Sequence, residues 1–317
     1  MSFVTAALLL APALALPPQE AGDDGSTQPT PEEIFEARIA YTRQFAERLE
    51  FEEGSVALAS GEAAFALPEG WAFLQARDAR RVVEDLWDNP PDPTTIGFID
   101  PPAAEGRLQS DYGIIVSMEL DGFIEDDDAA DLDYGEMLES LQEGARAANP
   151  ERIAAGYNSL ELVGWAEPPH YDSASKKLYW AKELAIGDYP ENTLNYDVRV
   201  LGRRGALVLQ AVAPMSAFDE VQEGMKVALA ATSFNEGHRY SDFDPGMDKV
   251  AAYGIGGLIA GKMAAKVGFF AVIAKFGKLI VVAVIGAFVA LKRFVFGGKD
   301  DANPYASQDE VEPEPAE

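Results

Sequence analysis

The feature that most constrains this chain is a C-terminal window without acidic residues. Between Lys249 and Lys299 there is no Asp or Glu, although the chain has 53 of them in all. Eight of the 25 basic residues lie in this window, so the remainder has 17 basic against 53 acidic residues. The window also holds repeated glycines and the apolar run LIVVAVIGAFVAL at 279–291. Two physically different parts therefore share one chain: a strongly acidic body and a basic, apolar C-terminal segment.

Residues 269–291 of this window are long and apolar enough to cross a membrane. As a helix they would measure about 34 Å, against ~30 Å for the hydrocarbon core of a bilayer. Lys275 and Lys278 fall inside the stretch, and a span requires them to snorkel toward one interface. A buried soluble helix is the alternative, but it does not account for the complete absence of acidic residues. We expect a transmembrane helix here, with Lys292 and Arg293 as its membrane flank.

The glycine-rich stretch at 248–268 is interpreted as a packing or interfacial segment. Its apolar run Val250–Gly261 is too short to cross a bilayer by itself. Gly257, Gly261 and Ala265 are spaced four apart, a pattern of small residues that lets membrane helices approach closely. These three are the candidate residues for helix packing. Whether the stretch spans, re-enters or lies on the membrane stays open.

The N-terminus has the pattern of a secretory signal peptide. Residues 6–16, AALLLAPALAL, form an apolar core of the usual length, and Ala13-Leu14-Ala15 supplies an A-x-A cleavage site. No positive charge precedes this core, which keeps an uncleaved apolar arm or a misplaced start codon as alternatives. We expect a signal peptide at 1–15 and a disordered linker at 16–30.

Together the two apolar segments predict a single-pass protein of the cytoplasmic membrane. A signal peptide would place residues 31–247 on the periplasmic (extracytoplasmic) side, and the basic residues after the span would stop transfer on the cytoplasmic side. Residues 292–317 are interpreted as this basic stop followed by an acidic disordered tail. The expected partners are the membrane lipid bilayer and, in the envelope, another protein or a second copy.

Charge and composition exclude several classes of function. A net charge of −28 argues against nucleic acid as a partner, because phosphate binding needs a basic surface. The absence of cysteine excludes disulfides, thiolate catalysis and cysteine-based zinc sites. We predict no cofactor.

Residues 31–247 are predicted to form an α+β domain with a mainly antiparallel sheet and flanking helices. Strands in close succession with short turns favour antiparallel pairing, and Gly202–Gly205 is expected to join two of them as a hairpin. Ser216 is the expected N-cap of the last helix. The predicted helices lie at 31–53, 77–88, 134–149 and 216–233, and the strands at 55–60, 62–67, 71–74, 95–100, 113–120, 159–168, 177–185, 194–201 and 206–213.

Candidate catalytic residues are few, because the chain has only two histidines. His170 stands beside Tyr171 and Asp172 in a turn-rich stretch between two predicted strands. The three would suit a proton-transfer or metal site, and an ordinary surface turn is the interpretation that we favour. His238 is interpreted as a packing and hydrogen-bonding residue at the junction before the membrane segment.

An acidic stretch and an aromatic cluster have alternative interpretations. Glu125–Asp128, continued by Asp131 and Asp133, would attract a hard cation such as calcium, but the EF-hand pattern fails and a solvated loop is favoured. The aromatic residues would either pack a β core or line a recognition groove. They are Trp165, Tyr171, Tyr179, Trp180, Tyr189 and Tyr196. Signature motifs of hydrolases, nucleotide-binding loops and zinc proteases are absent, so we predict no metal site and lean against an enzyme.

Five sequence blocks form a recognisable series. They are Gly-Trp-Ala-x-x-Pro-x-Tyr-Asp from Gly164, with His170 before Tyr171, then Lys177–Lys182, Asn195–Arg203, Gly237–Phe243 and Asp248–Gly254. The series resembles the bacterial family called domain of unknown function 2167, described as membrane-anchored proteins. The resemblance covers most of the chain after the linker and implies a signal peptide, an extracytoplasmic domain and a C-terminal anchor. It brings no established activity and no catalytic residues.

The leading hypothesis is a non-enzymatic binding or assembly module of the envelope. The first alternative is an enzyme acting on an envelope substrate, for which His170, Tyr171 and Asp172 are the candidate catalytic residues. The second is an accessory subunit of a membrane complex or transporter, in which the small residues at 257, 261 and 265 pack helices together.

Overall fold

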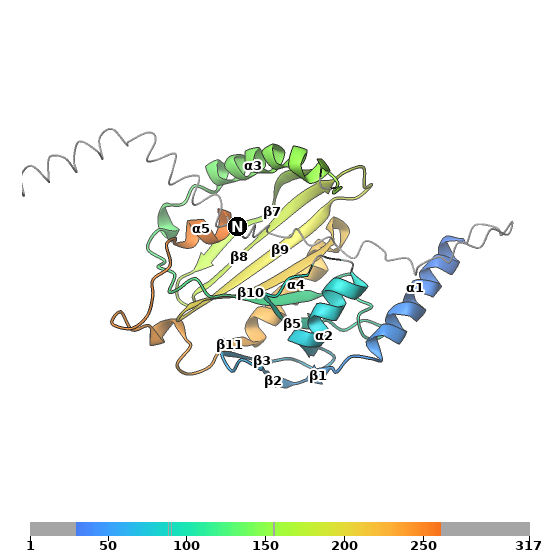
Figure 1. Cartoon of the computed structure of the whole chain (residues 1–317), viewed down its shortest axis with the longest axis horizontal. Helices are drawn as coiled ribbons and strands as arrows, with labels where there is room; N and C mark the ends of the chain where they lie inside the picture. Colours follow the sequence, from blue (N-terminus) through green and yellow to red (C-terminus); the bar gives the residue numbers. More distant parts are fainter. Residues whose placement is uncertain (1–29, 88, 90, 155, 261–317) are drawn as a thin grey trace, which may run out of the picture. The chain divides into compact units, whose positions relative to one another are not determined.

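An eight-stranded antiparallel sheet is the centre of the domain (Figure 1). The computed structural model describes residues 30–87, 89, 91–154 and 156–260. The strand order is β1-β4-β5-β6-β10-β9-β8-β7, and each adjacent pair is antiparallel. The strands are β1 (Glu52–Glu53), β4 (Ala72–Gln75), β5 (Thr95–Asp100), β6 (Ile114–Glu119), β7 (Leu160–Asp172), β8 (Lys177–Ile186), β9 (Thr193–Gly202) and β10 (Gly205–Pro214). This arrangement confirms the predicted α+β class.

A smaller antiparallel sheet and five α-helices complete the described part of the chain. The small sheet has the order β11-β3-β2, with β2 (Ser55–Ala57), β3 (Ala63–Ala66) and β11 (Thr232–Phe234). The helices are α1 (Pro31–Ala46), α2 (Ala76–Arg80), α3 (Tyr134–Ala154), α4 (Phe218–Ala231) and α5 (Ile255–Ala260). A π-helical turn, Arg81–Leu86, continues α2.

One face of the large sheet packs on α4 and on the small sheet. Alternate residues of β9, among them Leu194 and Val198, point to this side and share a core with Val221 and Met225 of α4. Phe65 of β3 joins the same core, where its ring stacks on a β4 phenylalanine at 4.9 Å. Each buried side chain of this size contributes roughly 1.5–3 kcal/mol to folding. This apolar layer is continuous.

The opposite face is covered by separate apolar patches. Leu86 and Val83, from the turn after α2, pack with Phe98 of β5. Residues of α3 pack over Leu184 of β8, and Ile255 of α5 packs in the cluster that contains Trp180. Figure 1 shows α2, α3 and α5 over different parts of the sheet. The middle of β9 therefore lies among three patches and belongs to none of them.

Helix boundaries differ from the predictions at both ends of the domain. α1 begins at Pro31 as predicted, with Thr30 and Glu33 as a capping box, but it ends at Ala46. Glu52–Glu53, predicted as the end of this helix, pair instead with β4 as β1. Ser216 is not an N-cap, so that prediction was wrong. Its backbone N–H donates to Glu191 Oε1 at 2.9 Å within a 3₁₀ turn that precedes α4.

The stretch around His170 was predicted as a turn, but it belongs to β7. This strand is at the edge of the sheet, and its pairing with β8 has three register shifts. Prolines are tolerated at bulges and on edge strands, where their missing N–H groups are not needed for pairing. Pro168 and Pro169 therefore interrupt the regular ladder without ending the strand, which continues to Asp172.

Several predicted features lie outside the described residues. They are the signal peptide at 1–15, the linker up to residue 29, Gly261, Ala265, the span at 269–291, Lys292, Arg293 and the tail. Among the described residues, no helix is long and apolar enough to cross a membrane. Gly257 lies in α5, where an added Cβ would come within 2.6 Å of Tyr253 Cβ. Among the described apolar residues of this stretch, Ile255, Leu258 and Ile259 pack on the domain itself.

Candidate functional site

The centre of β9 carries polar side chains on a buried face of the sheet. Asn195, Asp197 and Arg199 alternate with the core residues Tyr196 and Val198, so all three point to the side opposite α4. Asp197 is 1% exposed and Arg199 is 9% exposed. Charged residues are rarely buried to this degree unless they are paired.

Strand register surrounds Asp197 with specific neighbours. Trp180 of β8 and Gln210 of β10 stand directly opposite Asp197, close enough for side chains on one face to touch. Gln210 Nε2 donates to Asp197 Oδ1 at 3.1 Å, and Arg199 Nη1 donates to the same oxygen at 3.2 Å. Lys182 Nζ lies 3.5 Å from Asp197 Oδ2. We call these five residues the Asp197 cluster.

The cluster keeps hydrogen-bonding capacity that its own members do not use. The Arg199 guanidinium carbon lies 5.1 Å from the Trp180 ring, as in a cation–π contact. Within the part of the chain that the structure describes, Asp197 Oδ2, Arg199 Nε and Trp180 Nε1 are buried and make no hydrogen bond. Native proteins satisfy nearly all buried polar atoms, with protein or with water. Two N–H donors and one carboxylate oxygen of the cluster are exceptions, buried without a hydrogen bond among the described residues.

A second polar centre, Asp126 in the acidic loop, joins three segments that are distant in sequence. Asp126 Oδ2 accepts from the Tyr171 hydroxyl and from Lys176 Nζ, each at 2.7 Å. Its Oδ1 accepts from the Tyr240 hydroxyl at 3.0 Å. Burial alone would raise the pKa of Asp126, but the hydrogen bonds from Lys176 and the tyrosines hold that pKa below its ordinary value. Burial and the nearby carboxylate raise the pKa of Tyr171. The carboxylate therefore stays charged and the phenols stay protonated, which suits a structural tie.

The three predicted catalytic candidates use different partners. Tyr171 donates to the Asp126 carboxylate, as described above. Asp172 accepts from Ser175 Oγ at 2.6 Å and from Ala174 N at 2.9 Å, and these bonds in the β7–β8 turn hold its pKa low. His170 is exposed, with its ring centroid 5.1 Å from that of Tyr179. No hydrogen bond joins His170 to Tyr171 or Asp172 in the described structure.

The acidic stretch holds helix ends in place. Asp128 accepts from the backbone N–H groups of Ile255 at 2.9 Å and Gly256 at 3.0 Å, at the start of α5. Asp133 accepts from two N–H groups in the first turn of α3, at 2.8 and 3.0 Å. Carboxylates are favourable at helix N-termini because they pair with otherwise free N–H groups. Among the residues that the structure describes, no group of three or more His, Cys, Asp or Glu is placed to hold a metal ion.

The junction that contains His238 is tied firmly to the domain. Arg203 Nε donates to Asp248 Oδ2 at 2.7 Å, and its Nη1 donates to the carbonyl of Gly237 at 3.2 Å. The carbonyl of His238 accepts from the Arg203 backbone N–H at 2.9 Å. Tyr253 adds a hydroxyl hydrogen bond to Asp121. The predicted hydrogen-bonding role of His238 is thus observed in its backbone.

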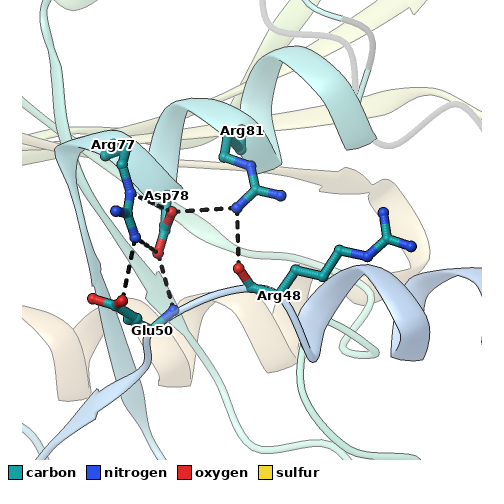
Figure 2. A network of polar contacts seen from close by, with 5 residues as sticks. All are labelled: Arg48, Glu50, Arg77, Asp78 and Arg81. Carbon is teal, nitrogen blue, oxygen red and sulfur yellow. Dashed lines mark hydrogen bonds and ion pairs between the residues drawn. The ribbon is translucent and has the colours of Figure 1, made fainter.

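A network at the other end of the domain joins the turn after α1 to α2 (Figure 2). Asp78 is buried and accepts from the Glu50 backbone N–H at 2.9 Å. Arg77 donates to both of its oxygens, at 3.0 and 3.1 Å. Arg81 Nη1 lies 3.5 Å from Asp78 and donates to the carbonyl of Arg48 at 3.1 Å. Both carboxylate oxygens are therefore occupied.

Sequence reasoning missed the Asp197 cluster, although a signal was present. Asn195, Asp197 and Arg199 alternate with apolar residues in a strand of the predicted sheet, which is typical of one solvated face. The structure shows instead that both faces of β9 are buried. The aromatic residues do not act as one group, either as a β core or as a recognition groove. Trp180 and Tyr196 are buried on opposite faces of the sheet, whereas Tyr189 is exposed.

A family model matches residues 50–289, and its description is "Protein of unknown function (DUF2167)". The chain belongs to this family. No curated protein matches the chain in sequence. The blocks on which the resemblance rests contribute Tyr171, Trp180, Asp197, Arg203 and Tyr240 to the polar centres described above.

Two solved structures match part of the chain at low similarity. Cyanobacterial PsbP from Synechocystis sp. PCC 6803 is 9% identical in sequence and has a TM-score of 0.34. The match covers 57% of this chain and 91% of the PsbP chain. The Ran-binding protein Mog1p of Saccharomyces cerevisiae is 13% identical in sequence and has a TM-score of 0.33. The match covers 62% of this chain and 100% of the Mog1p chain. Similarity at this level carries no inference about what this chain does.

Proposed function

We propose that this protein is a non-enzymatic binding or assembly module of the cell envelope. In this proposal the span at 269–291 holds it in the cytoplasmic membrane and the α+β domain lies on the extracytoplasmic side. The apolar N-terminal core and the acid-free C-terminal window support this location. The partner is another envelope protein or a second copy of the chain.

The observation that carries the proposal is the unused hydrogen-bonding capacity of the Asp197 cluster. Asp126 and Asp78 each use both oxygens to hold segments of the chain together. Asp197, by contrast, has one oxygen without a hydrogen bond among the described residues, beside a guanidinium and an ammonium. A partner group that accepts from Arg199 and Trp180 and donates to Asp197 would satisfy all three atoms. Because these atoms are buried, the partner reaches them only when the segments that cover this face of β9 move aside.

Crosslinking in membranes tests this function with the full chain. The wild type, solubilised in detergent after crosslinking, is expected to co-purify with a partner or with a second copy. Asp197→Asn keeps the shape of the side chain but turns an acceptor into a donor, so the crosslinked species should fall at least tenfold. Asp219→Asn, an exposed position on α4, is the matched control and should leave the yield unchanged.

Two results would contradict the proposal. One is a wild-type chain that yields monomer alone under conditions that crosslink other membrane proteins. The other is an Asp197→Asn variant that folds normally and keeps the full yield of crosslinked species.

A further inference from the structure

Three large apolar side chains are exposed on loops of the domain. Leu120 is 62% exposed, Met247 76% and Val250 41%. Isolated exposed apolar residues are ordinary on protein surfaces, but a group of them marks an interaction site. Whether these three form a group depends on how the loops that carry them are joined.

The loops meet beside the β9–β10 turn. The Phe123 N–H donates to the carbonyl of Lys249 at 2.8 Å, and the Ala251 N–H donates to the carbonyl of Phe123 at 2.7 Å. Gly122 permits this approach, because its φ is +120° and an added Cβ would lie 2.6 Å from the Lys249 oxygen. The Gly122 N–H also donates to the carbonyl of Arg204 at 3.1 Å. The segments that carry Leu120 and Val250 therefore run side by side.

Met247 is fixed to the same place by its neighbour Asp248. The carboxylate of Asp248 accepts from Arg203 in the β9–β10 turn at 2.7 Å and from the Asp244 N–H at 2.8 Å. The hydrogen bond from Arg203 holds the pKa of Asp248 below its ordinary value, so the ion pair persists at neutral pH. The three apolar side chains thus project from one tied set of loops.

Some charged side chains of these loops are engaged within the domain, and others are exposed. The carboxylates of Asp121, Asp242 and Asp248 are engaged by a tyrosine, by backbone N–H groups and by an arginine. The exposed cations on these loops and on the adjoining β9–β10 turn are Arg204, Arg239 and Lys249. Exposed carboxylates on the same loops are Glu125, Asp127 and Glu236. Because both signs are present, the surface is not a polybasic patch, and insertion of apolar side chains must dominate its affinity for lipid.

Chain length brings this end of the domain close to the predicted membrane span. The last described residue is Ala260, and the span begins at Phe269. Nine residues reach about 32 Å even when fully extended. α5 is itself fixed to the domain by Asp128 and by the burial of Ile255. The segment that carries Met247 and Val250 directly precedes α5 in the chain, so the tied loops are within reach of the same bilayer.

We infer that Leu120, Met247 and Val250 insert at the boundary between headgroups and acyl chains of the membrane that holds the span. The occupant of this surface is the lipid bilayer, and the inference rests on the proposed membrane anchorage. The exposed Arg204, Arg239 and Lys249 then pair with lipid phosphates around the inserted side chains. The domain lies on the membrane in one orientation, with the β9–β10 turn toward the lipid.

The absence of native cysteine allows a direct test. Full-length Leu120→Cys, Met247→Cys and Val250→Cys are labelled with an environment-sensitive fluorophore in vesicles of phosphatidylcholine and phosphatidylglycerol. Tyr189→Cys is the matched control, because this exposed residue lies in the β8–β9 turn at the opposite end of β9. Nitroxides attached to the lipids should quench the first three labels at least threefold more strongly than the control. Adding Leu120→Asp and Met247→Asp should reduce the quenching at Val250→Cys without lowering thermal stability, since both side chains are exposed.

The outcomes separate this inference from the anchorage on which it rests. A chain that alkaline carbonate releases from the vesicles overturns the anchorage and the inference together. An integral chain whose three labels are quenched no more than the control overturns the inference alone. Labels that are shielded from water but not quenched by lipid nitroxides also overturn it, because they indicate a protein interface on this surface.

Discussion

Helix α2 and the centre of β9 each bury an aspartate beside arginine, yet the two sites differ in how completely the carboxylate is used. Asp78 accepts from a backbone N–H and from two guanidinium groups, so that both oxygens are occupied (Figure 2). Asp197 accepts twice on one oxygen and makes only a 3.5 Å ion pair with the other. The same pair of residue types thus forms a fully hydrogen-bonded contact at Asp78 and leaves one carboxylate oxygen without a hydrogen bond at Asp197.

Removal of the completed tie should have the largest effect. Asp78→Ala leaves the Glu50 N–H and two guanidinium groups without their acceptor, and losing a partner of a buried charge costs about 3 kcal/mol. Urea unfolding of the full chain in detergent measures the loss. Arg77→Ala is the control and should cost less than about 1 kcal/mol, because the Arg77 side chain is 70% exposed. A larger loss from Asp197→Ala than from Asp78→Ala would reverse the comparison.

A third buried aspartate, Asp100, should make folding stability depend on pH in the opposite direction. Burial raises the pKa of Asp100 to about 6, although the Leu108 N–H and Arg107 oppose the shift. A raised folded-state pKa means that the stabilisation is complete below pH ~4 and is lost as pH rises through 6, by roughly 2–3 kcal/mol. Burial would also raise the pKa of Asp78, but the hydrogen bonds from Arg77 and Glu50 N lower it overall, so its contribution is lost as pH falls below ~4.

Unfolding of Asp100→Asn between pH 4 and 7 checks this sign. The charged groups that act on Asp100 among the described residues are Arg107 and, across its guanidinium, Glu53. The variant should lose the decrease in stability that the wild type shows between pH 4 and 6. If the stability of the variant falls between pH 4 and 6 as steeply as that of the wild type, another group titrates in this range.

The Asp126 tie should give a smaller effect. Tyr171→Phe removes one hydrogen bond to a charged carboxylate that keeps two other donors, for a loss of about 1 kcal/mol. Tyr189→Phe, at an exposed hydroxyl, is the control and should change stability by less than about 0.5 kcal/mol. Thermal unfolding of both variants is the measurement. Equal stability of the two would show that Asp126 is a dispensable tie.

The smallest effect on stability, with the largest on binding, is expected at Asp197. Asp197→Asn keeps the shape of the side chain, Lys182 is 23% exposed to water, and Arg199 keeps Glu119 and the Val198 carbonyl as partners. Unfolding should therefore change by about 1 kcal/mol, less than in Asp78→Ala. Its yield of crosslinked partner should nevertheless fall tenfold. Parallel losses in stability and in crosslinking would make Asp197 a structural residue like Asp78.

Local patterns in the sequence were sufficient for most of the large sheet. Thr95–Asp100 was predicted with its observed bounds, and the Gly202–Gly205 hairpin formed as expected. β1 and β11 were missed because strands of two or three residues exist only through pairing with distant segments. The β7 extension was missed because its prolines are compatible with a strand only at an irregular edge, which the sequence does not reveal.

The receptive site was harder to predict than the fold. Asp197 and Arg199 look like the solvated side of a strand until β9 is known to lie between β8 and β10 beneath a covered face. The predicted candidates at 170–172 were chosen because they are adjacent in sequence. Strand alternation and the β7–β8 turn then directed them to separate partners.

The pairing of β6 with β10 has a consequence for how the domain forms. Ile114 pairs with Ala211, so the sheet closes across nearly a hundred residues, whereas β7, β8, β9 and β10 pair in succession through short turns. Loop closure makes distant pairing slow, and local hairpins form first. During synthesis the N-terminal strands are therefore made early but stay incomplete until β10 emerges. The meander from β7 to β10 is the template on which the first half of the domain folds.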